Sequence, residues 1–280
     1  MLICAVLLLG GAWAQHENKD RDKDRGRRGA GDGRALVVAQ ISDTHIGLAK
    51  APNAPEQLRR VVEMVNQRRP DVVLVTGDIG ERPDAWRQAR EILGRLQAPV
   101  KYIPGNHDVN GRNEARYVQV FGANYYAFRM RNVTFFMLDS QLLGNYDRFE
   151  AHSPEPMSPE AAAAGDEMLE WLKNQKAPAG DAVIVVQHIP SDRGGNQAPD
   201  PKPYWTTQEP YRGRELEIMK RLGVQHEIAG HWHKQVLFDA GGIHYHVAPA
   251  TSWAVAGPLG FAMHTITPEG DVRSEFVPLQ

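Results

Sequence analysis

The chain has 280 residues, of which 42% are hydrophobic, and this is enough for one substantial core. Its formal net charge of -2 gives no support for a surface that binds polyanions, so nucleic acid is not an expected partner. Length alone would allow two small domains. The candidate functional residues, however, are spread from residue 43 to residue 233 and must meet in space, which favours one domain.

The N-terminus has the pattern of a secretory signal. Residues 2–14 are apolar, too few to span a bilayer as a helix, and end in Ala12-Trp13-Ala14, an A-x-A type cleavage site. We therefore predict a signal peptide over residues 1–14, a secreted or periplasmic location and no stable membrane insertion. No Lys or Arg precedes the apolar run, which leaves two alternatives: a start further upstream, or retention of the segment as a membrane tether. Cleavage would remove Cys4, the only cysteine, and with it any disulfide.

A charged stretch follows, and the folded domain begins after it. Residues 15–34 are rich in Asp, Lys, Arg and Gly and show no apolar periodicity. Such a stretch buries too little surface to offset its ordering entropy, so we expect a disordered tether. We place the folded domain at residues 35–280.

The first part of this domain alternates strands and helices. Short apolar runs predict buried strands, and apolar residues at helical spacing, such as Leu58, Val61, Val62 and Val65, predict amphipathic helices. The expected elements are strands 36–41, 72–76 and 100–103 and helices 55–69 and 84–96. This βαβαβ order predicts parallel strands with right-handed crossovers.

The second part mixes hairpins with further helices and strands. Residues 125–130 and 133–138 form one expected hairpin; 235–238 and 243–247 form another, joined through Ala240-Gly241-Gly242. The other expected elements are helices 159–175 and 213–222 and strands 182–186, 225–229, 261–266 and 272–276. We therefore predict an α/β fold in which two mixed sheets pack face to face as a sandwich, with helices outside.

Five short segments, each after a predicted strand, carry metal-ligand residues. They are Asp43-Thr44-His45, Gly77-Asp78, Gly105-Asn106-His107-Asp108, Gln187-His188 and Gly230-His231-Trp232-His233. In an extended segment, residues two apart point the same way, so the Asp and His of D-x-H are expected to bind one ion together, as are the two imidazoles of H-x-H. Either motif alone is a weak signal.

Glycine precedes three of the candidate ligands. Gly77, Gly105 and Gly230 each lie where a predicted strand ends, and glycine permits a positive φ and a close backbone approach. A single Gly-Asp or Gly-Asn pair most simply makes a turn. Loops at the carboxyl ends of parallel strands are nevertheless where such folds place their sites.

Taken together and in this order, these segments resemble the five-block signature of calcineurin-like metallophosphoesterases. The resemblance spans residues 36–279. Gln187-His188-Ile189-Pro190 and the aromatic-rich insertion before Gly230 are most similar to the branch around the calcineurin-like phosphoesterase domain-containing phosphatases. The resemblance implies a metal-dependent phosphoric ester hydrolase in which a hydroxide that bridges two metal ions attacks phosphorus.

The resemblance also implies a division of the ligands, with Asp78 bridging the two ions. One ion would be held by Asp43, His45, Asp78 and His233, and the other by Asp78, Asn106, His188 and His231. The donors are nitrogen and oxygen without thiolate, which suits Mn, Fe or Zn. Purple acid phosphatases of this superfamily carry a tyrosine three residues after the bridging aspartate. Here that residue is Glu81, which disfavours the iron-tyrosinate version.

His107 remains for the leaving group. It follows Asn106 directly, and we expect it to protonate the leaving oxygen or to stabilise its developing charge. Asp108 is expected to accept the ring N–H of His107 and to fix its tautomer.

The substrate is expected to be a phosphate monoester of a small molecule or a protein, with a cyclic-nucleotide or other phosphodiester as the alternative. A non-catalytic metal-binding protein and a nuclease are weaker readings. Candidate contacts to the substrate are Arg193, Tyr204, Trp205, Arg212 and Trp253, most of them in a long Pro-rich segment after His188. Six histidines are expected not to bind metal: His16, His152, His226, His244, His246 and His264. Of these, His244 and His246 are expected on the polar face of a strand.

Overall fold

The computed structural model describes residues 33–109, 114–146, 157–194 and 204–279. The predicted signal peptide, residues 15–32 of the predicted tether, His16 and His152 lie outside the described residues.

One sheet has five strands in the order β11-β10-β1-β2-β3. The strands β1, β2 and β3 are parallel, as the βαβαβ order predicts. On the other side of β1, β10 pairs antiparallel with β1, and β11 pairs antiparallel with β10. Their bounds are Leu36–Ile41 for β1, Val72–Thr76 for β2, Val100–Ile103 for β3, Gly260–Ile266 for β10 and Val272–Pro278 for β11.

The other sheet has six strands in the order β4-β5-β6-β7-β9-β8. The four inner strands are parallel, and the two edge strands pair antiparallel with their neighbours. The bounds are Tyr126–Met130 for β4, Val133–Met137 for β5, Ala182–Val186 for β6, His226–Ala229 for β7, Val236–Ala240 for β8 and Ile243–Val247 for β9.

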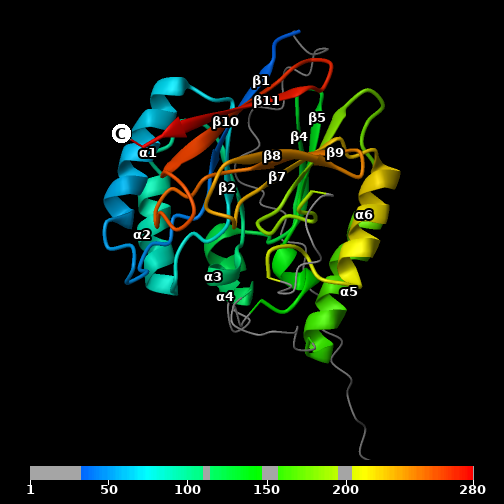
Figure 1. The fold of residues 1–280 in the computed structure, drawn as a ribbon, viewed down its shortest axis with the longest axis horizontal. Helices are drawn as coiled ribbons and strands as arrows, with labels where there is room; N and C mark the ends of the chain where they lie inside the picture. Colours follow the sequence, from blue (N-terminus) through cyan, green and yellow to red (C-terminus); the bar gives the residue numbers. More distant parts are fainter. Residues whose placement is uncertain (1–32, 110–113, 147–156, 195–203, 280) are drawn as a thin grey trace, which may run out of the picture. The chain divides into compact units, whose positions relative to one another are not determined.

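Helices cover both sheets on the sides that face away from the sandwich interior. Figure 1 shows α1 and α2 on one flank of the strands and α5 and α6 on the other. The first pair shares a buried apolar cluster with the five-stranded sheet, and the second pair shares one with the six-stranded sheet. The helices are α1 Ala54–Arg68, α2 Pro83–Leu93, α3 Asn106–Val109, α4 Glu114–Phe121, α5 Pro159–Lys173 and α6 Tyr211–Leu222, with a 3₁₀ turn η1 at Ser140–Leu143.

A third apolar cluster lies between the sheets. Val38 and Leu74 of the five-stranded sheet are fully buried there with Phe135 and Ile184 of the six-stranded sheet. Burial on both faces explains why the parallel strands read as continuous apolar runs in the sequence. The predicted sandwich of two mixed sheets with flanking helices is confirmed.

Polar contacts of three histidines join the two sheets. His226 Nδ1 lies 3.1 Å from His246 Nε2, while His246 Nδ1 and His264 Nδ1 both contact Ser274 Oγ, at 2.7 and 2.6 Å. Of the two histidines expected on the polar face of one strand, His244 is exposed but His246 is buried, because Ser274 and His226 supply its partners. That expectation was therefore wrong for His246.

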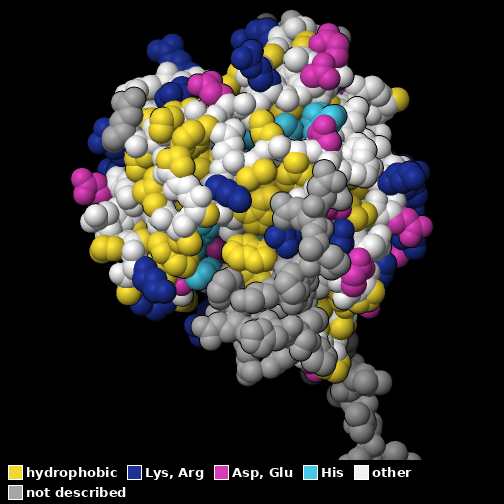
Figure 2. Space-filling model, viewed as in Figure 1, with side chains coloured by type: hydrophobic (Ala, Val, Ile, Leu, Met, Phe, Trp, Pro, Cys, Tyr) yellow, Lys and Arg dark blue, Asp and Glu magenta, His cyan; other side chains and the backbone are white. Residues whose placement is uncertain are grey.

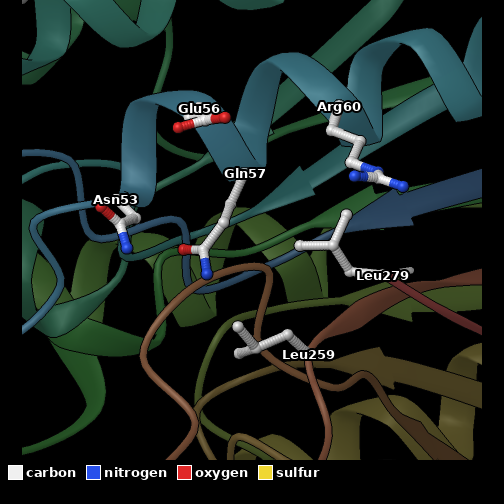
Figure 3. Close-up of a pocket in the computed structure, with 6 residues that line it drawn as sticks. All are labelled: Asn53, Glu56, Gln57, Arg60, Leu259 and Leu279. Atoms are coloured by element: carbon white, nitrogen blue, oxygen red, sulfur yellow. The ribbon is translucent and has the colours of Figure 1, made fainter.

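A surface pocket of about 370 Å³ lies along α1. In Figure 3 it is bordered by side chains of the helix on one side and by two leucines on the other; the lining residues are Asn53, Glu56, Gln57, Arg60, Leu259 and Leu279. None of them is a candidate ligand. Among the described residues, no helix is both long enough and apolar enough to cross a membrane.

Candidate metal centre

The candidate ligands leave the carboxyl ends of parallel strands in both sheets. Asp43 follows β1, Asp78 follows β2 and Asn106 begins α3 directly after β3, whereas His188 follows β6 and His231 follows β7. Backbone hydrogen bonds join these loops: Asp43 N–H donates to Gly77 O (3.1 Å) and Gly230 N–H donates to His188 O (3.0 Å). The sandwich thus brings segments far apart in sequence to one place.

Two groups of ligand atoms form there, and both contain Asp78. The first group is Asp43, His45, Asp78 and His233; the second contains Asp78, His188 and His231. All of these side chains are buried. His188 Nε2 lies 3.3 Å from Asp78 Oδ2, and His233 Nε2 lies 3.1 Å from Asp43 Oδ1, so nitrogen and oxygen donors face one another.

Hydrogen bonds hold one nitrogen of each imidazole and leave the other for the centre. His188 Nδ1 contacts Thr76 O at 2.7 Å and His233 Nδ1 contacts Trp253 O at 3.1 Å. His45 Nδ1 contacts Glu81 Oε1 at 3.0 Å, and His231 Nε2 contacts the backbone oxygen of Tyr204 at 2.9 Å. Because these oxygens accept, each ring nitrogen that faces one carries the proton, and the opposite nitrogen is free to bind a metal.

Three buried polar atoms of this set have no hydrogen-bond partner: Asp43 Oδ1, Asn106 Oδ1 and His188 Nε2. A buried acceptor without a partner costs free energy, and native structures rarely leave one. A metal ion satisfies such atoms directly. The donor set of carboxylate, amide oxygen and imidazole therefore fits a pair of transition-metal ions.

The backbone at the centre is strained. Eight non-glycine residues in the described part have a positive φ, and six of them lie here: Asp43, His45, Asp78, His231, His233 and Trp253. Such conformations each cost on the order of 1 kcal/mol and concentrate at functional sites. They also correct the sequence reasoning for D-x-H and H-x-H. Asp43 and His45 reach one ligand group through left-handed turns and not through the alternation of an extended strand. His231 and His233 lie in different ligand groups, so the prediction that H-x-H binds one ion was wrong.

Two glycines allow the loops to approach one another. A Cβ at Gly105 would overlap the Asp78 carboxylate, and a Cβ at Gly230 would overlap Ser42 Oγ. Neither φ lies in the left-handed region, so the reason for glycine here is the close approach and not the conformation. The sequence prediction that glycine serves the turns around the ligands is thereby refined for these two positions.

The electrostatics of the group favour ionised carboxylates. Although burial opposes charge, contacts with His233 and His188 hold the pKa of Asp43 below its usual range, and contacts with His188 and His107 do the same for Asp78. Burial likewise opposes a charge on His188, but Asp78 and Asp43 raise its pKa to about 9. Burial and the neighbouring His188 lower the pKa of His231 to about 3. The carboxylates thus keep the negative charge that binds cations.

His107 lies beside the centre with a carboxylate partner that the sequence analysis did not assign to it. Its Nδ1 lies 2.9 Å from Glu81 Oε2, and its backbone N–H donates to Asp78 Oδ1 (2.9 Å). Burial disfavours the imidazolium, but Asp78 and Glu81 outweigh it and raise the pKa of His107 to about 9. Glu81 also contacts His45, so one carboxylate orients both rings. A residue three positions after Asp78 was noted in the sequence, but only spatial contact shows this role.

Asp108 does not accept the ring N–H of His107, contrary to the sequence prediction. Its carboxylate accepts backbone N–H groups of Ile79, Gly80 and Gly105 at 2.9–3.1 Å. The reason is geometric: the short helix α3 turns Asp108 inward beneath the loop after β2. Asp108 therefore joins the loop that carries Asp78 to the loop that carries Asn106.

The predicted substrate contacts fall into two groups. Tyr204 and Trp253 lie at the centre: the Tyr204 hydroxyl accepts from Asn106 Nδ2 (3.0 Å), and the Trp253 ring centroid is 5.1 Å from that of His45. The Trp205 ring centroid is 5.6 Å from that of His231, and its backbone oxygen accepts from Trp232.

The two predicted arginine contacts lie in the segment after β6. Arg212 donates to Ser191 O (2.9 Å) and to Asp192 Oδ2 (3.1 Å), so its guanidinium stabilises that segment. The contact of Arg212 with phosphate stays a prediction. Arg193 is partly buried next to Asp192.

Comparison with known proteins agrees with this geometry. The model of the calcineurin-like phosphoesterase family matches residues 36–235. The chain therefore belongs to the calcineurin-like phosphoesterase family and is a metal-dependent phosphoric ester hydrolase. The family binds a dinuclear metal centre, and the two ligand groups that share Asp78 correspond to one.

Individual relatives include both phosphatases and phosphodiesterases. The chain is 25% identical to the serine/threonine-protein phosphatase CPPED1 of Danio rerio, over 81% of this chain and 78% of the relative. It is also 25% identical to the 3′,5′-cyclic adenosine monophosphate phosphodiesterase CpdA of Escherichia coli, over 79% and 78%. Among solved structures, a dimetal phosphatase from Danio rerio matches with a TM-score of 0.65 at 16% identity, covering 88% of this chain and all of the other. The predicted family and branch are confirmed.

Proposed function

We propose that this protein hydrolyses phosphate monoesters at a centre of two metal ions. One ion would be held by Asp43, His45, Asp78 and His233 and the other by Asp78, Asn106, His188 and His231. The observation that carries the proposal is the pair of buried ligand groups that share Asp78, with His107 at their edge. The similarity to a protein named as a serine/threonine phosphatase supports the choice of monoesters.

The residues of the chain divide the chemistry between them. When bound, two metal ions neutralise phosphate oxygens and lower the pKa of water, which makes a nucleophile available near neutral pH. His107 Nδ1 faces Glu81, so its Nε2 is the nitrogen that can give a proton to the leaving oxygen. The raised pKa of His107 keeps the imidazolium available for this step. The hydrogen bonds of Asp108 and the close packing at Gly105 hold the loop that carries Asp78 against the loop that carries Asn106.

We further propose Mn, Fe or Zn as the metals. The donors are nitrogen and oxygen atoms, and these ions accept such mixed sets. Glu81, which stands where a tyrosinate ligand would be required for the purple acid type, contacts His45 and His107 instead.

A phosphodiesterase is the second candidate. The similarity to a cyclic adenosine monophosphate phosphodiesterase, at the same identity as the phosphatase, favours it. The same metal centre serves both reactions, since the difference is whether the pocket admits a second ester arm.

The test uses the protein from residue 15 onward, reconstituted separately with Mn, Fe and Zn and assayed for metal content. Hydrolysis of p-nitrophenyl phosphate is compared with that of bis-p-nitrophenyl phosphate. Preference for the monoester supports the proposal, and preference for the diester replaces it with the phosphodiesterase. Two bound ions with no turnover of either ester contradict both.

We also propose that residues 1–14 direct secretion or periplasmic export and that residues 15–34 act as a tether, with retention of the first segment as a membrane tether as the alternative. N-terminal sequencing of the exported protein tests this proposal. Nucleic acid remains an unexpected partner. On the face drawn in Figure 2, Lys and Arg side chains are interspersed with Asp and Glu and do not gather into a stripe.

A further inference from the structure

Trp253 is held beside the metal centre in a conformation that bulky residues rarely adopt. Its φ is +59°. The preceding residue ties the loop down: Ser252 N–H donates to Asp43 O (3.2 Å) and Ser252 Oγ donates to Thr44 O (2.6 Å). Glycine would take this φ without strain, so an indole at this position indicates that the side chain serves the site.

The indole stands against three imidazoles of the site. Its ring centroid lies 5.1 Å from that of His45, 5.2 Å from that of His233 and 6.3 Å from that of His107, with interplanar angles of 90°, 78° and 78°. Part of the ring packs against the apolar cluster of the five-stranded sheet, and the residue is only partly buried. Trp253 therefore extends the wall of the site outward from His45 and His107.

Lys50 adds a positive charge to this wall. Its Nζ lies 5.8 Å from the centroid of the Trp253 ring, a cation–π distance, and the residue is exposed. Within the described ranges, no carboxylate forms an ion pair with Lys50. An exposed cation over an aromatic ring that itself contacts His45 and His107 suits an anionic group on a planar ligand.

We propose that Trp253 and Lys50 form the subsite for the leaving group, and that the substrate is a phosphate monoester of a planar aromatic group with an additional negative charge. This inference rests on the proposed phosphatase function. In the reaction a water molecule releases one proton to solvent and its oxygen bonds to phosphorus, the ester P–O bond breaks, and the leaving oxygen takes the proton from His107 Nε2, which solvent then replaces. The group attached to that oxygen then extends past His107 to the indole, where its ring stacks and its charge meets Lys50.

The experiment compares three monoesters: phenyl phosphate, 4-carboxyphenyl phosphate and β-glycerophosphate. Trp253→Leu should lower the ratio of kcat/KM for phenyl phosphate to that for β-glycerophosphate by about three- to tenfold, the value of one aromatic contact, and Trp253→Phe should retain most of it. At low salt, Lys50→Met should lower the preference for 4-carboxyphenyl over phenyl phosphate by about two- to fivefold, and Lys50→Arg should preserve it. Val255→Ala, at a residue of the same loop that is 60% exposed, is the matched control.

The outcomes separate this inference from the function on which it rests. If the metal-loaded wild-type protein hydrolyses none of the three esters, the proposed function fails. If it hydrolyses them but both variants leave the substrate ratios unchanged, only the leaving-group subsite is refuted. If Trp253→Leu loses bound metal and slows all esters equally, Trp253 merely positions His45 and His233, and the inference is again overturned.

Discussion

Replacing Asp108 by Asn tests the role that the structure gives this carboxylate. Burial, together with the nearby Asp78 carboxylate, raises the pKa of Asp108 to about 7, while backbone N–H groups oppose the shift. Each hydrogen bond that its carboxylate makes with the described residues is an acceptor contact, so these bonds favour the ionised form, which burial and Asp78 oppose. Asn keeps one oxygen and places an NH₂ where the other stood, so one backbone N–H, of Gly80 or of Gly105, would face a donor.

The magnitude follows from these contacts. A buried N–H without its acceptor costs about 1–3 kcal/mol, and the remaining hydrogen bonds lose the strength that a charged acceptor provides, about 1 kcal/mol each. Loss of the buried charge beside Asp78 offsets part of this cost, so we expect Asp108→Asn to lower the free energy of unfolding by about 1–2 kcal/mol. Because the two loops that Asp108 joins carry Asp78 and Asn106, metal affinity should fall by about 10–100-fold, as for other residues that orient ligands.

Urea unfolding of the metal-free protein and metal titration measure these two effects, with Glu81→Gln as the matched control. The control keeps the shape of a partly exposed side chain and leaves no backbone N–H without its acceptor, so its unfolding free energy should change by less than that of Asp108→Asn. Glu81→Gln should instead lower kcat, most strongly with poor leaving groups, because His107 loses its charged partner. If Asp108→Asn leaves stability intact and instead alters the leaving-group dependence, the structural role of Asp108 is refuted. The role predicted from the sequence, acceptance of the ring N–H of His107, is then supported.

Three further expectations follow from the site and the core. Gly105→Ala should abolish metal binding, because its Cβ would overlap the Asp78 carboxylate; full metal content in this variant would contradict the packing. His107→Ala should retain both metals but lose rate, most severely for alkyl esters, and equal losses for alkyl and aryl esters would argue against proton donation. Burial lowers the pKa of His264 to about 3, so this residue stabilises the fold above the unfolded-state pKa of about 6.5, and that stability is lost as pH falls from there toward 3, by about 1.4 kcal/mol per pH unit. Urea unfolding at several pH values gives the slope of the free energy of unfolding against pH. Between pH 3 and 6.5 this slope should be smaller in His264→Gln by about 1.4 kcal/mol per pH unit, the contribution of one proton.

Much of the fold could be predicted from the sequence because both sheets have buried parallel strands. The strands β1, β2, β3, β6 and β9 begin and end where their apolar runs predict. Three short elements were missed: α3, α4 and the 3₁₀ turn η1. The helix α3 has four residues, all inside the ligand motif, and α4 buries only Tyr117 and Phe121, so neither shows a helical period long enough to recognise.

The ligand types could be predicted from the five motifs, but their supporting contacts could not. Glu81 orients His107 across 26 residues of sequence, and Asp108 serves the loop after β2, because both partnerships arise only when β2 and β3 lie side by side. Similarly, no sequence pattern distinguishes His246, which is buried between the sheets, from His244, which is exposed two residues earlier on the same strand.

The central claim is that Asp78 is shared by two metal ions that drive phosphoester hydrolysis. The most direct measurement is metal content together with turnover of p-nitrophenyl phosphate, for the wild-type protein and for Asp78→Asn. The wild-type protein should bind two ions per chain and be active, whereas Asp78→Asn should bind both ions more weakly and be inactive. An active Asp78→Asn protein with two tightly bound ions would contradict the claim.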